Sequence, residues 1–154
     1  MPVITPSQRI VADESSRACG SKHAEWISEA GGLTQFGAFI EVLQAGARSS
    51  IKHWHTAEDE LVFVLDGEVT VIEGDTETIM RPGDAATFRA GDPIGHCLVN
   101  RSQSPSRCLV VGTRSAQDRI TYPDHDRVAT YAPGCSTPAW TDSAGRPAQS
   151  PYLD

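Results

Sequence analysis

The chain has 154 residues, a formal net charge of −7 and a pI near 5.1. Domains most often run about 100–150 residues, so we expect a single domain. The acidic balance argues against nucleic acid and anionic membranes as partners, because both are bound through a basic face.

The expected location is the cytoplasm. The four cysteines, Cys19, Cys97, Cys108 and Cys135, show no C-x-x-C spacing, which is typical of reduced thiols rather than a disulfide framework. No apolar run approaches the about 18 residues of a membrane span. The N-terminus also lacks the charged-then-apolar pattern of a signal peptide.

Residues 1–34 are predicted to form an N-terminal arm. The arm is polar except for the short amphipathic stretch SKHAEWISEA, which ends at Gly31 and Gly32. We expect Trp26 and Ile27 to dock the arm on its own barrel or on a second subunit. Two copies sharing such apolar ends would form a homodimer.

Residues 35–122 are predicted to form an all-β barrel, because short β-rich runs alternate with turn signals at close spacing. The runs include QFGAFIEVLQ, SIKHWH, ELVFVL, EVTVIE, HCLVN and RCLVVGT. The turn signals are Asp66-Gly67, Gly74-Asp75, Pro82-Gly83-Asp84 and Gly91-Asp92-Pro93. A sandwich would give a similar pattern.

Residues 123–154 are predicted to form a C-terminal tail, which has no strand or helix period from Ala132 onward. Four prolines interrupt this part after Ala132, at Pro133, Pro138, Pro147 and Pro151. The tail also carries Trp140 and Tyr152, so we expect an extended segment packed on the barrel or on the partner subunit.

A candidate metal site begins at the run His53-Trp54-His55. Side chains two apart on a strand share a face, so both imidazoles point one way and Trp54 points the other. Glu60 follows the polar turn 56–59 and shares a face with Val62 and Val64, opposite Leu61 and Phe63.

His96 opens a later strand and can supply a third imidazole at the same end of the barrel. Three neutral imidazoles and one carboxylate suit one divalent ion per chain: Mn, Fe, Ni, Co or Zn. In octahedral geometry, the four protein ligands His53, His55, Glu60 and His96 leave two positions for water or substrate.

The same residues lie within two motifs that resemble those of the cupin superfamily. Gly46, His53-x-His55, Glu60 and Gly67 look like the first cupin motif, and Gly83, Gly91, His96 and Asn100 look like the second. The chain departs from the second motif at Arg89, where the family usually has proline, and in a longer stretch before His96. The resemblance covers 35–122 and implies a double-stranded β-helix, the jelly-roll barrel of small single-domain bacterial cupins.

Several residues near the motifs are candidates for catalysis or substrate binding. Glu58 and His125 are candidate acids or bases, since one lies beside the ligand run and the other leaves the last barrel strand. Arg48 and Arg89 are candidates for holding a carboxylate or phosphate. Trp54 is predicted to pack on the outer face or at a subunit contact, with a substrate platform as the alternative.

The expected substrate is a small oxygen-rich metabolite that chelates the ion in a mostly apolar cavity. The first hypothesis is an isomerase, lyase or decarboxylase in which the metal acts as a Lewis acid. The alternatives are an Fe(II)-dependent dioxygenase and a non-catalytic sensor that binds a small ligand through the metal. The choice among them depends partly on family analogy, because one fold hosts many chemistries.

Overall fold

The computed structural model describes residues 3–153 and confirms the predicted all-β class. Its strands form three antiparallel sheets, and within residues 3–153 its helices are short 3-10 turns: η1 (Pro6–Gln8), η2 (Pro123–His125) and η3 (Pro151–Leu153). None of these described helices is long and apolar enough to cross a membrane.

The largest sheet forms one wall of the barrel. It has the order β1-β2-β3-β10-β5-β8 and is made of β1 (Ile10–Asp13), β2 (Lys22–Trp26), β3 (Phe36–Leu43), β10 (Ser106–Thr113), β5 (Glu60–Asp66) and β8 (Ala85–Phe88).

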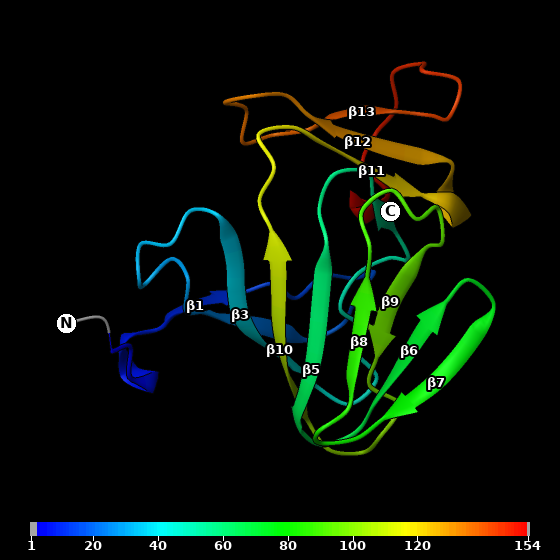
Figure 1. Ribbon diagram of the computed structural model, residues 1–154. Helices are drawn as coiled ribbons and strands as arrows, with labels where there is room; N and C mark the ends of the chain where they lie inside the picture. The colour runs from blue at the N-terminus through cyan, green and yellow to red at the C-terminus, as the bar shows by residue number, and fades with distance from the viewer. Residues whose placement is uncertain (1–2, 154) are drawn as a thin grey trace.

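Two smaller sheets complete the molecule. The three-stranded sheet contains β7 (Thr76–Met80), β6 (Val69–Glu73) and β9 (His96–Val99). The four-stranded sheet contains β13 (Ala139–Thr141), β12 (Arg127–Tyr131), β11 (Asp118–Tyr122) and β4 (Trp54–His55). In Figure 1, β11, β12 and β13 lie across the upper end of the strands β5, β8 and β10.

Strand alternation on β5 fills the space between the walls. Val62 and Val64 are fully buried, whereas Leu61 and Phe63 are 38% and 36% exposed on the other face. This is the predicted alternation, and it places Glu60 on the inner face with the two valines. The inner valines join a core of Leu43, Ala47, Val69, Val71, Met80, Leu98, Cys108 and Val110.

The segment predicted as an N-terminal arm contributes two strands to the large sheet. Trp26 lies opposite Phe39 in the β2–β3 pairing, and their ring centroids are 4.3 Å apart. The sequence left open whether Trp26 docks on its own barrel or on a second subunit. In the structure, Trp26 packs on Phe39 of its own barrel.

The C-terminal part is more regular than the extended tail expected from the sequence. β12 pairs with β11, and β13 pairs with β12, so this part of the chain prolongs a sheet. The edge of β11 that does not pair with β4 supplies the hydrogen-bonding partners of β12, which a local sequence pattern does not reveal. Tyr152 contacts the body as predicted, since its hydroxyl accepts a hydrogen bond of 3.3 Å from the Ile51 amide.

Candidate metal centre

Two of the predicted ligands are brought together by the backbone. His53 and His96 form an isolated antiparallel bridge, in which each amide donates to the other residue's carbonyl at 3.1 and 2.8 Å. The imidazole centroids lie 5.0 Å apart. Residues that are distant in the sequence therefore present their rings to a common space.

His55 reaches this space from β4. Its strand pairs with β11, with Ile120 opposite His55, and its ring centroid lies 5.0 Å from that of His53. The two imidazoles are thus neighbours, as their spacing predicts.

Glu60 completes the group from the first position of β5. Its Oε2 lies 3.9 Å from Nε2 of His96. His53, Glu60 and His96 each offer one ligand atom, and these atoms lie within 4.8 Å of one another. His55 falls outside this tight group and instead shares a second group with Glu58 and Asp118.

Hydrogen bonds determine which imidazole nitrogens are available to a metal. Nδ1 of His53 donates to the Ile51 carbonyl at 2.9 Å, and Nδ1 of His55 donates to Oδ2 of Asp118 at 2.6 Å. Both acceptors lack protons, so Nε2 of each ring carries the lone pair that a metal needs.

His96 gives the clearest sign that these residues fit a metal ion. Its Nε2 is buried and has no hydrogen-bond partner among the residues that the structure describes. A buried polar nitrogen without a partner is destabilising, and a metal ion would satisfy it. Phe88 fixes the ring orientation by stacking on it, with centroids 3.6 Å apart and planes 2° from parallel. Three imidazole nitrogens and one carboxylate suit a borderline divalent ion.

The electrostatics keep His53 and Glu60 in their ligating forms, whereas they favour the proton on His55 that a metal ion would displace. Burial, followed by the neighbouring His55, lowers the pKa of His53 to about 4, so this ring is neutral at neutral pH. Burial would raise the pKa of Glu60, but the neighbouring imidazoles, with His96 first, outweigh burial and lower it. For His55, burial lowers the pKa, and the Asp118 carboxylate reverses this effect and raises it.

Asp118 is a site residue that the sequence did not reveal. It is buried at the start of β11, where Oδ2 accepts from His55 and Oδ1 accepts from the Ala57 amide at 2.9 Å. Only the β4–β11 pairing brings it to the histidine, so no local motif could indicate its role.

Two cavities meet at the candidate ligands. We call them the Lys22 cavity, of about 300 Å³, and the Trp54 cavity, of about 440 Å³, after one residue that lines each. His53 lines the first and His55 the second. Residues common to both are Glu58, Glu60, His96 and Thr113. A bound ion is therefore within reach of molecules in either cavity.

Glu58 and Arg89 both lie at these cavities. Glu58 lines both cavities; its Oε1 accepts from the Ser115 amide at 2.8 Å, and its Oε2 lies 3.9 Å from Nδ1 of His55. Arg89 is exposed and lines the Trp54 cavity.

Trp54 also lines the Trp54 cavity, although the sequence favoured a packing role for it. The strand β4 is only two residues long and pairs with β11. Trp54 and His55, the two residues of β4, therefore line the same cavity.

The structure does not bring Arg48 and His125 to the centre. Arg48 bridges to Val99, its amide donates to the Cys19 carbonyl at 2.8 Å, and it lines neither cavity. His125 is exposed in η2 and lines neither cavity. The connection after β11 turns toward β12 instead of returning to the histidines.

Comparisons with known proteins agree with this architecture. A family described as Cupin domain matches residues 39–112. No curated protein sequence matches the chain. The structure is similar to a sugar phosphate isomerase from a cupin superfamily of Silicibacter pomeroyi, at 36% identity and a TM-score of 0.82 over 95% of this chain and 94% of that one.

Two further solved structures are similar. A putative sugar phosphate isomerase from Acidithiobacillus ferrooxidans has 25% identity and a TM-score of 0.76, over 84% of this chain and 81% of that one. A predicted oxalate decarboxylase from Thermotoga maritima has 19% identity and a TM-score of 0.63, over 73% of this chain and 99% of that one. At this lower identity, the likeness concerns the fold alone.

Proposed function

The chain belongs to the cupin superfamily, and on that premise we propose that it is a metal-dependent isomerase acting on a sugar phosphate. The observation that carries the proposal is the convergence of His53, Glu60 and His96, with the buried Nε2 of His96 lacking a partner, where two cavities meet. The similarity in sequence and structure to the Silicibacter pomeroyi protein supports the choice of reaction class.

In this proposal, His53, His55, His96 and Glu60 hold one divalent ion. The ion would supply Lewis acidity toward the oxygen of a substrate carbonyl. Because the inner side chains around the four donors include Val62 and Phe88, the chain itself limits how much water surrounds that carbonyl.

Glu58 is the proposed acid–base residue. Isomerisation of an aldose to a ketose moves one proton between adjacent carbons and another between their oxygens. We assign to Glu58 the removal of the proton from the carbon next to the carbonyl and its return to the former carbonyl carbon. The Ser115 amide holds Oε1, which leaves Oε2 on the side of His55 for this transfer.

Arg89 is the proposed phosphate contact. It lines the Trp54 cavity, and it takes no part in the ion pairs that arginines form within residues 3–153. A guanidinium can donate two parallel hydrogen bonds to phosphate oxygens. The substrate would thus lie with its phosphate toward Arg89 and its carbonyl toward the metal ligands.

The test is proton exchange followed by NMR in D₂O. The protein is loaded with Mn²⁺, Co²⁺, Ni²⁺, Zn²⁺ or, without oxygen, Fe²⁺, and given five- and six-carbon aldose phosphates. We expect isomerisation with deuterium entering at the carbon next to the carbonyl. Replacing Glu58 with Gln should lower this rate by about 10²–10⁴-fold while the metal stays bound. The exposed surface variant Glu77→Gln is the control and should act as the parent protein does.

Three outcomes would contradict the isomerase. Neither isomerisation nor exchange with any of these sugars and metals would exclude the reaction. Oxygen consumption with Fe²⁺ would favour the dioxygenase, and tight binding of a small ligand without turnover would favour a sensor.

A further inference from the structure

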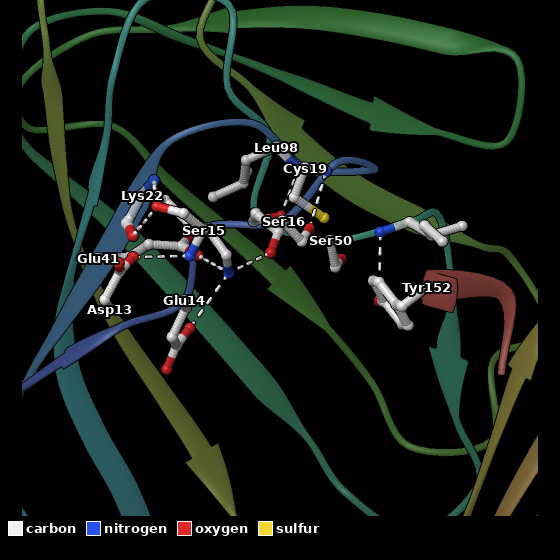
Figure 2. A network of polar contacts seen from close by, with 12 residues as sticks. Asp13, Glu14, Ser15, Ser16, Cys19, Lys22, Glu41, Ser50, Leu98 and Tyr152 are labelled. Atoms are coloured by element: carbon white, nitrogen blue, oxygen red, sulfur yellow. Dashed lines mark hydrogen bonds and ion pairs between the residues drawn. The ribbon is translucent and has the colours of Figure 1, made fainter. Parts of the chain in front are cut away.

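The Lys22 cavity contains an ion pair inside the barrel that the proposed chemistry does not use. Lys22 on β2 and Glu41 on β3 are 9% and 3% exposed, and Nζ of Lys22 lies 2.9 Å from Oε1 of Glu41. The same ammonium donates to Oε2 of Glu14 at 3.2 Å and to the Ser49 carbonyl at 2.5 Å. Figure 2 shows this network around Lys22, Glu41 and Glu14.

Fold stability does not account for these charges. Taking two charges out of water is costly, and well-packed apolar residues often serve a core equally well. The positions beside Glu41 on the inner face follow that rule, because Cys108 and Val64 are buried and apolar. The ion pair instead lines a cavity that continues to His53, Glu60 and His96.

One acceptor of this pair is left for a ligand. The ammonium of Lys22 has three protons, and its three bonds to Glu41, Glu14 and Ser49 use them. Glu41 accepts through Oε1, whereas its Oε2 makes no hydrogen bond with any residue between 3 and 153. A carboxylate oxygen in this position accepts a hydrogen bond from a hydroxyl group.

The charge at this end of the cavity discriminates among ligands. One ammonium faces two carboxylates, those of Glu14 and Glu41, so this end is formally negative. A phosphate or second carboxylate is therefore disfavoured here, while hydroxyl groups are accepted. Trp26 and Phe39 line the same cavity and offer apolar rings to the C–H faces of a sugar.

We infer that the Lys22 cavity is a subsite for the hydroxyl-bearing, phosphate-free end of a polyhydroxy substrate, with Glu41 accepting a hydroxyl hydrogen. This inference rests on the proposed function and adds an orientation to it. The phosphate points toward Arg89 in the Trp54 cavity, and the hydroxyl groups remote from it point toward Glu41. Dicarboxylates, which bring a negative charge to both ends, are rejected.

The experiment measures binding of sorbitol 6-phosphate, an open-chain polyol without a carbonyl, by calorimetry to the metal-loaded protein. Glu41→Gln should weaken binding by about tenfold or more, because a hydroxyl loses its charged acceptor. Its metal content should stay at the parent value. Glu77→Gln, which removes a carboxylate outside both cavities, is the matched control and should bind as the parent protein does.

A double variant, Lys22→Met with Glu41→Leu, separates binding from folding. Without the charge pair, the barrel should stay folded with an unchanged or higher melting temperature, yet lose affinity for sorbitol 6-phosphate by about tenfold or more. The inference is overturned if the double variant unfolds or either variant binds the polyol as the parent protein does. It is also overturned if the parent protein binds malonate more tightly than sorbitol 6-phosphate. Polyol binding that depends on Glu41, without any isomerisation, would instead reject the proposed function alone.

Discussion

At His55, one buried carboxylate decides which ring nitrogen faces the other ligands. Asp118 accepts the Nδ1 proton at 2.6 Å and is itself held by the Ala57 amide. The ring is thereby fixed both in tautomer and in orientation, and His53 is fixed in the same way by the Ile51 carbonyl. Such outer partners of a ligating histidine raise its basicity toward a metal.

Asp118→Asn tests this arrangement at the scale of one atom. Asparagine keeps an oxygen for the Ala57 amide but replaces the carboxylate that fixes His55. We expect metal affinity to fall by about 10–100-fold, measured by competition with a chromophoric chelator. The control is Asp124→Asn, because Asp124 pairs with Lys52 at 3.1 Å and lines neither cavity. Equal affinities in the two variants would show that Asp118 does not act on the metal site.

At the scale of elements, the alternation of side chains within one strand could be predicted, because it depends only on the residues of that strand. The inner position of Glu60 with Val62 follows from period two, and the facing of His53 and His55 follows from the same rule. The strands β1, β2, β12 and β13 could not be predicted in this way, because their order depends on which neighbouring edge is free. Asp118 was missed for the same reason, since its contact with His55 depends on the β4–β11 pairing. For Trp54, the sequence left open both packing and a substrate platform, and the residue lines a cavity.

Gly67, a glycine of the first motif, lies between β5 and β6, where the backbone passes close to Pro105. It has a φ of +76°, and a Cβ there would lie 2.7 Å from the Pro105 carbonyl oxygen. Gly67→Ala should lower the free energy of unfolding by about 3 kcal/mol, from both the left-handed backbone and the clash. Gly46, with a φ of +82° and open space around it, is the matched control and should lose only about 1 kcal/mol. If urea unfolding shows similar losses of stability in the two variants, the close approach to Pro105 is not the cause of the loss at Gly67.

At the scale of the whole molecule, the outer face of the barrel carries exposed apolar side chains. Leu61, Phe63 and Leu65 project from one face of β5 and are 38%, 36% and 40% exposed. The N-terminal segment, which was expected to dock on its own barrel or on a second subunit, pairs with β3 of its own chain. The homodimer remains a prediction, and this outer face of β5 is the surface to test for it.

Light scattering at tens of micromolar protein should give a mass about twice the 16.6 kDa of the chain. Phe63→Lys should shift the mass to that of one chain, because an unpaired charge is costly in an apolar contact. Ile79→Lys is the control, since Ile79 is 50% exposed on β7 in a different sheet. A parent protein that is already monomeric would contradict the dimer.

The central claim is that His53, His55, Glu60 and His96 bind one divalent ion, and metal stoichiometry tests it most directly. Protein purified without an affinity tag is loaded with Mn²⁺ or Zn²⁺, desalted and assayed by elemental analysis beside His96→Ala. We predict one ion per chain in the parent protein and little or none in the variant, which should still fold because the apolar sheet faces supply most of the stability. Equal metal content in a folded His96→Ala protein, or no bound ion in the parent, would contradict the account.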